Sequence, residues 1–446
     1  MIPEDRREAA AQTPRGGFPE ADPPVGWRCL MALATRRVVV TGMGAVTPLG
    51  VGVGTSWEGL CAGRNGIARI QSFDPEPYGS QMAGEVRDFD PADFIERKQI
   101  SRTARFTQFA LAATSEAMEQ AKLPIDDSNR DLVAVIVGSG IGGLRVTEEA
   151  TLTLAEKGPR RLSPFTVPMI LSDIAAGEIA MRFGASGPNF ALVSACASGA
   201  HAIGEAGEII RRGDAVAAIC GGTEASITPL AVGAFNSMRA LSQRNDDPEH
   251  ASRPFDLDRD GFVVAEACGV LILEEWDHAR TRGARALAEL AGYGASADAY
   301  HLTAPEPTGR GARRVMQRAL EKADASPAEV DYINAHGTST PLNDAAETAA
   351  IKQVLGDRAR QIPVSSTKSM TGHSLGAAGA IESVFAVMAL VDGRVPPTIN
   401  YVTPDPECDL DYVTEGARTV WPKLVLNNSF GFGGHNACLA FRAVED

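Results

Sequence analysis

Short apolar runs alternate with longer amphipathic segments along most of the chain. The runs are rich in Val, Ile and Ala and end at Gly or another small residue, a pattern typical of buried β-strands. They are residues 36–42, 131–138, 190–195, 215–222, 269–275, 286–294, 330–335, 362–366 and 424–430. The clearest helical patterns between them are 103–123 and 344–356. This alternation predicts an α/β protein with mostly parallel or mixed sheets covered by helices.

Two stretches of the chain share one plan. Residues 190–213 and 362–393 each hold a short strand, a turn of small and polar residues, and a Gly/Ala-rich helix that ends near Gly. Such a repeat predicts two related halves, which we assign to 35–285 and 286–446. Small residues at both helix starts predict that the two helices pack closely together at the centre.

Residues 1–34 break the pattern, because they are charged, rich in Pro and Gly, and without periodicity. They lack the apolar core of a signal peptide, and their acidic residues argue against a transit peptide. We expect a disordered tail, and both Met1 and Met31 remain open as the true first residue.

Composition and charge exclude several classes of protein. The chain has 446 residues, 44% hydrophobic and 22% charged, which is typical of a soluble globular protein. Its net charge of −14 argues against general nucleic-acid binding but allows one local basic patch. We expect no apolar run of the roughly 18 residues that span a bilayer, and hence no membrane segment.

The number and spacing of the cysteines indicate the redox state of the compartment in which the protein works. There are seven, scattered, and none is spaced as CxxC. An odd, dispersed set argues against a disulfide framework or a zinc site, so we expect no metal and a reducing cytoplasm.

Cys196 has the most informative setting of the seven. It lies among Ser, Ala and Gly in SACASGAHAIG, where a strand should end and a helix begin. Free N–H groups and the positive end of a helix dipole stabilise a thiolate there. Local sequence alone leaves two readings open, a nucleophile and a buried structural cysteine.

Two histidines lie at similar junctions. His336 follows the strand pattern of 330–335, and His373 precedes the second Gly/Ala-rich helix, with Lys368 before it and Glu382 within that helix. A loop histidine is more often structural than catalytic, but two at strand–helix junctions are harder to dismiss in a chain with seven.

Two other patterns suggest ligand sites and fail on inspection. Residues 137–143 satisfy GxGxxG after a strand, but no second strand with a terminal acid follows about 20 residues on. Residues 256–266 resemble an EF-hand loop, but its twelfth position is Ala267 and Glu266 is one residue short. We expect neither a nucleotide nor calcium.

Five segments together resemble the signature segments of β-ketoacyl-[acyl-carrier-protein] synthases. They are SACASGAHAIGEA (194–206), RPFDLDRDGFV (253–263), NAHGTSTPLND (334–344), STKSMTGHSLGAAGAIES (366–383) and NNSFGFGG (427–434). The resemblance covers essentially Arg36 to the C-terminus. It implies the thiolase fold, with two pseudo-symmetric halves in five layers, α-β-α-β-α. The Cys–His–His set is similar to that of the elongating type, synthase II, as against the Cys–His–Asn type that starts chains.

The resemblance implies a decarboxylating Claisen condensation that lengthens an acyl chain by two carbons in fatty acid biosynthesis. Cys196 would carry the acyl chain as a thioester, with the N–H groups of Cys196 and Phe432 as its oxyanion hole. His336 and His373, both neutral, would donate hydrogen bonds to the enolate left by decarboxylation. Lys368 and Glu382 would form a buried ion pair that fixes the His373 loop.

The resemblance also implies how substrate and carrier protein bind. Thr338 and Thr340 match positions that hold the pantetheine arm, Ile141 and Phe430 would line the substrate site, and Phe432 would act as a gate. The acidic acyl carrier protein would dock on basic residues, which we expect to be Arg97, Lys98, Arg102, Arg239 and Arg244. Family members are usually homodimers. No cofactor is implied beyond the phosphopantetheine that carries the substrates.

Rival classes fit less well. A ketosynthase of a type II aromatic polyketide pathway would carry the same catalytic set and remains the alternative. A thiolase needs a second cysteine near the C-terminal Gly-rich loop, and Cys438 lies within the following strand instead. Ser374, the segment 265–270 and His435 depart from the commonest family pattern. Because Ser374 and the region of Cys268 bear on the shape of the pocket, the preferred chain length stays open.

Overall fold

A computed structural model describes residues 36–444. The expected tail, together with Met31 and Cys29, lies outside these residues. Within them, strands from both halves of the chain join into an 11-stranded mixed sheet in the order β11-β10-β14-β15-β9-β1-β8-β7-β5-β6, with β2 off this path. The two halves meet where β1 pairs with β9 through Val39–Glu289 and Val40–Ala288.

The two halves repeat the same strand order. The N-terminal half contributes β1 (Val38–Thr47), β5 (Val133–Gly138), β6 (Asn189–Phe190), β7 (Ala217–Glu224) and β8 (Ala267–Glu275). The C-terminal half contributes β9 (Ala288–Ala297), β10 (Tyr332–Asn334), β11 (Val364–Ser365), β14 (Leu424–Gly431) and β15 (His435–Arg442). In each half the second strand pairs in parallel with the third and fourth, and the fifth pairs antiparallel with the fourth and first. The repeat predicted from the sequence is therefore confirmed.

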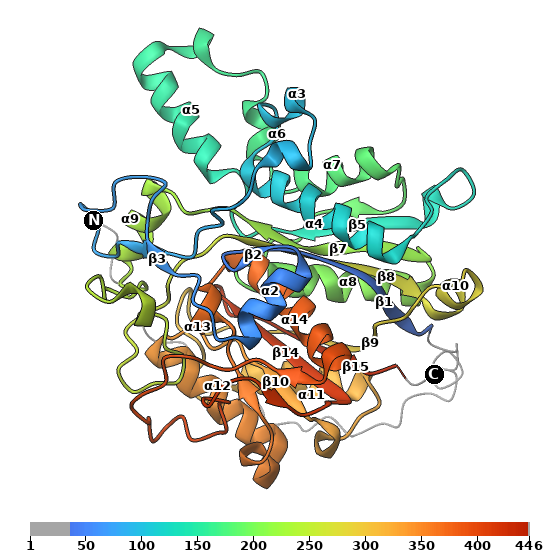
Figure 1. The fold of residues 1–446 in the computed structure, drawn as a ribbon, viewed down its shortest axis with the longest axis vertical. Coiled ribbons are helices and arrows are strands. Elements are labelled where there is room, and N and C mark those ends of the chain that lie inside the picture. Colours follow the sequence, from blue (N-terminus) through green and yellow to red (C-terminus); the bar gives the residue numbers. More distant parts are fainter. Residues whose placement is uncertain (1–35, 445–446) are drawn as a thin grey trace, which may run out of the picture. The chain divides into compact units, whose positions relative to one another are not determined.

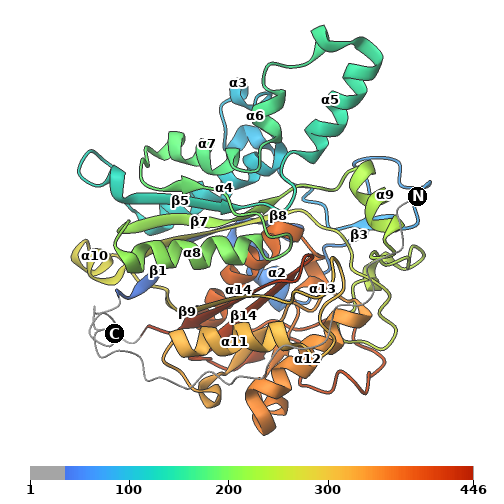
Figure 2. The same ribbon diagram turned by 180° about the vertical axis from the view of Figure 1, so that it is seen from behind.

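Helices complete a layered structure (Figure 1). Helices α4 (Arg105–Ala121) and α7 (Ile174–Phe183) cover the outer face of the N-terminal strands, and α11 (Arg310–Lys322), with α12 (Pro341–Leu355) beside it, covers the C-terminal strands. Between the two sets of strands lie α8 (Ser198–Arg212) and α14 (Ala378–Asp392), the central layer seen from behind in Figure 2. These are the five layers expected of the thiolase fold.

Shorter elements connect these layers. The helices are α2 (Val53–Cys61), α3 (Arg97–Ile100), α5 (Leu144–Lys157), α6 (Thr166–Ile170), α9 (Pro229–Ser237), α10 (Trp276–Thr281) and α13 (Lys368–Thr371). The strands are β2 (Gly50–Val51), β3 (Ala68–Arg69), β4 (Met82–Ala83), β12 (Arg394–Val395) and β13 (Arg418–Thr419).

The central helices touch through glycine and alanine. A Cβ on Gly199 of α8 would lie 2.8 Å from the Cβ of Ala380, and one on Gly379 would lie 2.7 Å from the Cβ of Ala200. The backbones approach closely because these positions carry almost no side chain. The predicted close packing of the two helices is confirmed.

The central helix also corrects one expectation. Leu375–Asp392 forms an 18-residue window of mean hydropathy 1.7, long and apolar enough to cross a membrane. The expectation that no run reaches this length was therefore wrong. Since 83% of this window is buried inside the protein, its apolar character is explained by packing on both sides in the core.

The strand predicted over 190–195 is much shorter than expected. Pairing ends at Phe190, because the following residues turn toward the start of α8. The N–H of Ala197 bonds to the carbonyl of Ser194, and Ala195 has a φ of +50°. The apolar pattern of this segment therefore belongs mostly to a turn, which is the turn that carries Cys196.

Candidate active site

One cavity of about 590 Å³ brings together candidate residues from both halves of the chain. Cys196, Gly140 and Ile141 come from the N-terminal half, and most of the remaining candidates come from the C-terminal half. The latter are His336, Thr338, Thr340, His373, Phe430 and Phe432. Residues that are far apart in the sequence thus face a single space.

Cys196 lies in a tight turn just before α8. Hydrogen bonds of the Ser198 hydroxyl hold this turn: it accepts from the N–H of Ser194 at 2.9 Å and donates to the carbonyl of Ala195 at 2.6 Å. The positive φ of Ala195 is uncommon for a residue with a side chain and turns the next residue toward the cavity. Cys196 is 8% exposed, and that exposure is to the cavity.

Two backbone N–H groups approach the sulfur of Cys196. They belong to Phe432 and to Cys196 itself, and both lower the pKa of the thiol. Gly431 leaves the space open, since a Cβ there would lie 3.0 Å from the nitrogen of Cys196. These are the two donors that the family resemblance implies for an oxyanion hole.

The protonation state of Cys196 differs from what the helix terminus alone suggested. Burial raises the pKa of the thiol to about 12, although Lys368 and the two N–H groups lower it. The desolvation of a thiolate inside the protein outweighs these favourable interactions. The resting enzyme therefore holds Cys196 as a neutral thiol.

His336 and His373 form a perpendicular pair across the cavity. Their ring centroids lie 5.4 Å apart at an interplanar angle of 86°. Nδ1 of each ring is enclosed without a hydrogen-bond partner among the described residues, which leaves Nε2 to face the cavity. Burial and the nearby charge of Lys368 hold the pKa of both histidines well below the usual value. Each ring is neutral and can donate one N–H.

A carboxylate that the sequence reasoning missed holds the loop of His336. Glu347, on α12, accepts hydrogen bonds from the N–H groups of His336 at 2.9 Å and Gly337 at 2.8 Å. Asn428 also donates to it at 3.1 Å. His336 lies in the loop before α12 and Glu347 in the second turn of that helix, and nothing in the sequence singles this glutamate out.

The loop of His373 is fixed from two sides. Its N–H donates to the carbonyl of Val263 at 2.7 Å, and its carbonyl accepts from Ala265 at 2.9 Å. Below it, Lys368 and Glu382 form a buried ion pair, 1% and 2% exposed. Burial raises the pKa of Glu382 to about 7, and Lys368 opposes this shift. The pair expected from the resemblance is present.

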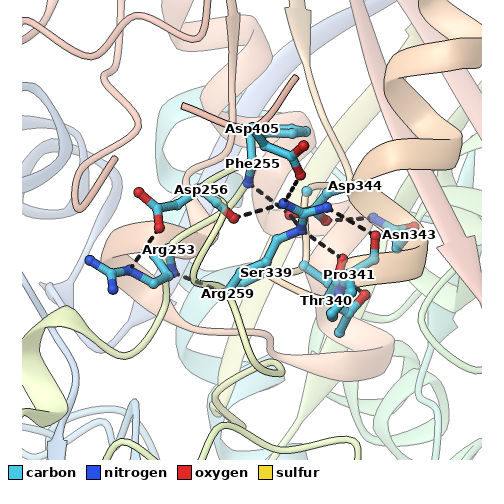
Figure 3. A network of polar contacts seen from close by, with 12 residues as sticks. Arg253, Phe255, Asp256, Arg259, Ser339, Thr340, Pro341, Asn343, Asp344 and Asp405 are labelled. Carbon is cyan, nitrogen blue, oxygen red and sulfur yellow. Dashed lines mark hydrogen bonds and ion pairs between the residues drawn. The ribbon is translucent and has the colours of Figure 1, made fainter. Parts of the chain in front are cut away.

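A buried polar network ties 253–261 to the loop after His336 (Figure 3). Arg259 donates to the carbonyls of Thr340 and Pro341 and pairs with Asp405 at 2.5 Å. The Asp256 carboxylate accepts the N–H groups of Val402 and Thr403. Asp256, in the segment that resembled an EF-hand, thus accepts the protein's own N–H donors, and Arg259 in the same segment holds the Thr340–Pro341 backbone.

The GxGxxG segment forms part of the cavity wall. Gly140 and Ile141 line it, and the N–H of Gly140 donates to the buried carboxylate of Glu224 at 2.7 Å. A donor that would face a pyrophosphate in a nucleotide site is therefore used internally. Thr338 and Thr340 lie on the opposite loop with their hydroxyls 2.9 Å apart.

The basic residues expected at the entrance do not gather in one place. Arg239 lines the cavity, next to the end of α9. Arg102 stacks on Phe165 at 4.9 Å, and Lys98 pairs with Glu96 at 2.8 Å. Figure 1 shows α3, which contains Arg97 and Lys98, apart from α9. Arg244 reaches the carbonyl of Asp258 at 3.4 Å. None of the other four lines the cavity.

A third histidine has a structural role near the nucleophile. Nδ1 of His201, on α8, lies 2.6 Å from the hydroxyl of Ser194, and Nε2 lies 3.3 Å from the carbonyl of Asn436. His201 therefore links the turn of Cys196 to the segment that follows the Gly-rich loop. Its position on a helix face gave no sign of this in the sequence.

Comparisons with known families give two adjacent matches. The model of the β-ketoacyl synthase N-terminal domain matches residues 35–279, and that of the C-terminal domain matches residues 287–402. Together they cover most of the chain.

Individual relatives agree with these matches. The chain is 54% identical to a 3-oxoacyl-[acyl-carrier-protein] synthase 2 of Synechocystis sp., over 93% of this chain and 99% of that protein. It is 51% identical to the protein of the same name in Staphylococcus aureus, over 92% and 99%.

Solved structures show the same similarity. One is a type II polyketide ketosynthase in complex with its acyl-carrier protein, 40% identical with a TM-score of 0.86, covering 92% of this chain and all of that chain. Another is a β-ketoacyl synthase from Burkholderia phymatum, 36% identical with a TM-score of 0.85, with the same coverage.

Proposed function

The chain belongs to the β-ketoacyl synthase family, and from this membership we propose how its residues share the reaction. The enzyme is an acyltransferase of the 3-oxoacyl-[acyl-carrier-protein] synthase 2 type, which elongates acyl chains in fatty acid biosynthesis. The observation that carries the assignment of roles is the single cavity shared by Cys196, His336 and His373.

Cys196 accepts the acyl chain in the first step. Its sulfur forms a bond to the carbonyl carbon of the acyl thioester, the bond from that carbon to the pantetheine sulfur breaks, and the thiol proton passes to the departing pantetheine. The negative charge that develops on the carbonyl oxygen is met by the N–H groups of Cys196 and Phe432. Because the resting thiol is neutral, the proton leaves only when substrate is in place.

His336 and His373 act in the second step. The malonyl group loses carbon dioxide, and the electron pair of the broken bond becomes an enolate whose charge rests on the thioester oxygen. The two neutral imidazoles donate Nε2–H to that oxygen. The enolate carbon then bonds to the acyl carbon, and the bond between that carbon and the Cys196 sulfur breaks to release the β-ketoacyl product. The sulfur leaves as a thiolate and takes up one proton from solvent, which restores the neutral thiol.

Lys368 and Glu382 act on this step through position and charge. Their buried pair lies beneath the His373 loop, and the charge of Lys368 adds to the larger effect of burial, which lowers the pKa of both imidazoles. A protonated imidazole would still donate, but it would bring a full charge into the site before the enolate exists. The pair therefore helps to keep the donors neutral until charge develops on the substrate.

The substrate arms approach from different walls of the cavity. We assign the pantetheine arm to Thr338 and Thr340 and the acyl chain to Ile141 and Phe430, all of which line the cavity. Phe432, beside the sulfur of Cys196, acts as the gate between the free and acylated states. No resident cofactor enters the scheme, because both substrates bring phosphopantetheine with the carrier protein.

Acyl carrier protein is the partner of the enzyme, and Arg239 at the cavity is the best-placed docking residue. Charge reversal, Arg239→Glu, should raise the KM for carrier-linked substrate, and the loss should shrink as salt rises. Lys423→Glu, an exposed change outside the cavity lining, is the matched control. An equal loss with a small pantetheine thioester would contradict docking at this residue.

We also propose a homodimer in the cytoplasm, without nucleic-acid or membrane partners. Support for the dimer comes from the outer strand β6 and its surroundings, where apolar side chains face solvent. Phe190 is 40% exposed, Val193 59%, Leu171 46% and Met181 70%. Ile141, on the acyl side of the cavity, is itself 37% exposed, so a second copy seated here would cover that wall.

A type II polyketide ketosynthase remains the second candidate, because a solved structure of that class is 40% identical to this chain. One assay separates the two functions. The enzyme is incubated with acyl carrier protein loaded with an acyl primer and with excess malonyl carrier protein. Intact mass spectrometry then measures the masses of the carrier-protein products. A fatty acid synthase of this type stops after one two-carbon extension, whereas repeated extension without reduction would identify the polyketide enzyme.

A further inference from the structure

Glu224, the last residue of β7, is a fully buried carboxylate that the mechanism above does not use. It accepts four hydrogen bonds. Oε2 accepts from the N–H of Gly140 at 2.7 Å and of Gly376 at 3.2 Å, and Oε1 accepts from the hydroxyls of Ser226 at 2.9 Å and Ser139 at 3.3 Å. Among the described residues it has no ion-pair partner.

The two N–H groups on Oε2 come from different halves of the chain. Gly140 precedes Ile141, which we assign to the acyl site. Gly376 belongs to the turn Leu375–Ala377 and is three residues after His373. A single oxygen atom thus joins the acyl wall from the N-terminal half to the histidine loop from the C-terminal half.

Gly140, Gly376 and the carboxylate of Glu224 are closely packed, and we call this contact the joint. A Cβ on Gly376 would lie 2.1 Å from the nitrogen of Gly140, and a Cβ on Gly140 would lie 2.8 Å from Oε2 of Glu224. Since protein interiors at this density transmit displacements instead of absorbing them, neither loop can shift without moving the shared acceptor.

We propose that Glu224 is a positioning residue that couples the acyl wall at Gly140–Ile141 to the loop of His373. This rests on the proposed function, because it assumes that the acyl chain lies against Ile141. A long chain that presses on this wall moves the N–H of Gly140, and the shared oxygen passes the movement to Gly376. The coupling makes decarboxylation sensitive to what the acyl site contains.

A role of the charge itself can be separated from this coupling. The carboxylate lies close enough to Cys196 to raise the pKa of its thiol, in addition to the larger effect of burial. A glutamine can keep all four contacts, because its amide oxygen accepts both N–H groups while its NH₂ donates to the hydroxyls of Ser139 and Ser226, which can turn to accept. Glu224→Gln therefore removes the charge and keeps the joint.

The test compares Glu224→Ala, Glu224→Gln and the control Ser226→Ala, which removes one contact of Oε1 and leaves the shared oxygen in place. For each, kcat/KM of condensation and the rate of carbon dioxide release are measured with acetyl and with long-chain acyl carrier proteins. We expect Glu224→Ala to lose about tenfold more with long chains than with acetyl, equivalent to about 1.4 kcal/mol. Glu224→Gln and Ser226→Ala should keep the wild-type ratio.

Two results would overturn the proposal. An equal loss of Glu224→Ala at every chain length would indicate general destabilisation, and a loss in Glu224→Gln as large as in Glu224→Ala would assign the effect to charge. If Glu224→Ala does not fold, Gly140→Ala replaces it in the test, because its Cβ displaces the same oxygen of Glu224. Gly140→Ala must then lose more activity with long acyl chains than with acetyl. An equal loss at every chain length would also overturn the proposal. Failure of the wild-type enzyme to condense any acyl group would instead refute the proposed function.

Discussion

Burial sets the protonation state of the residues around the cavity. It keeps Cys196 a thiol, lowers the pKa of His336 and His373 so that both rings are neutral, and raises the pKa of Glu382 to about 7. The three side chains assigned to the reaction, Cys196, His336 and His373, are therefore uncharged at rest. Preorganised N–H donors are suited to charge that appears only during reaction.

The state of Cys196 leads to a prediction for chemical labelling. Because the thiolate is the reactive form and burial raises the pKa to about 12, alkylation by iodoacetamide should become about tenfold faster for each pH unit from about pH 7 to about pH 9. Peptide mapping after timed labelling measures the rate at Cys196 separately from the half-buried Cys61. If the rate of alkylation is already constant near pH 7, the pKa of Cys196 lies below about 7. The helix terminus would then lower this pKa by more than burial raises it.

The sequence predicted some residues of the site and missed others for a physical reason. Cys196, His336 and His373 lie in segments with recognisable composition, at the ends of strands, where side chains can reach a crevice. Glu347 and Glu224 act by accepting backbone N–H groups that become neighbours only after folding. A buried acceptor of this kind has no local pattern, so it becomes visible only in three dimensions.

At the scale of elements, α8 and α14 form one of the contacts between the two halves. This contact was predictable, since small residues at both helix starts indicate close approach of backbones. The early end of the strand expected over 190–195 was not predictable from the sequence, because an apolar run can belong to a strand or to a buried turn. The positive φ of Ala195, which decides between them, has no signature in an alanine.

The helix contact predicts a specific loss of stability. Gly199→Ala places a Cβ 2.8 Å from that of Ala380, so overpacking should cost about 1–3 kcal/mol in the free energy of unfolding. Gly177→Ala, within α7 and with no atom within 4 Å of the new Cβ, is the control and should stabilise by about 0.4–1 kcal/mol. Urea unfolding of both variants measures the difference, and equal values would show that the helices can separate at little cost.

The hydrogen bonds that Glu274 accepts, one of them from His278 on α10, predict that the stability of the protein depends on pH. Burial alone would raise the pKa of Glu274, but hydrogen bonds from Arg282, His278 and Thr41 lower it to about 2. A lowered pKa in the folded state stabilises the protein above the unfolded pKa near 4.5, and this contribution is lost as pH falls toward 2. Glu274→Gln should therefore be less stable than wild type by up to about 3 kcal/mol at neutral pH. In urea unfolding, the difference in the free energy of unfolding between wild type and Glu274→Gln should become smaller as the pH falls from about 5 to about 3. A difference that became larger would contradict the assigned contacts.

At the scale of the whole molecule, the two halves share one topology and divide the chemistry. The turn between β6 and α8 carries Cys196, and the equivalent connection between β11 and α14 carries His373. The repeat of strand order was predictable from the two similar segments. The way the halves join, through short pairing of β1 with β9, depends on contacts between distant strands and had no local sign.

The exposed edge of β6 predicts the oligomeric state. Val193→Asp places a charge in the proposed contact and should convert the dimer to monomers in sedimentation velocity. Val402→Asp is the matched control, because Val402 is 72% exposed on the other half and should leave the dimer intact. A wild-type monomer, or a dimer that tolerates Asp at residue 193, would contradict the assignment of this face.

The most direct test of the account compares acyl loading with decarboxylation in three variants. His336→Ala and His373→Ala should each still gain an acyl mass at Cys196 when mixed with acyl carrier protein, because loading uses only the thiol and backbone N–H groups. Both should release carbon dioxide from malonyl carrier protein about 100- to 1,000-fold more slowly, the usual cost of losing one donor to a developing charge. Cys196→Ala should gain no acyl mass while its histidine donors remain. A histidine variant that fails to load yet decarboxylates normally would make that histidine the base for Cys196 and contradict the division of roles.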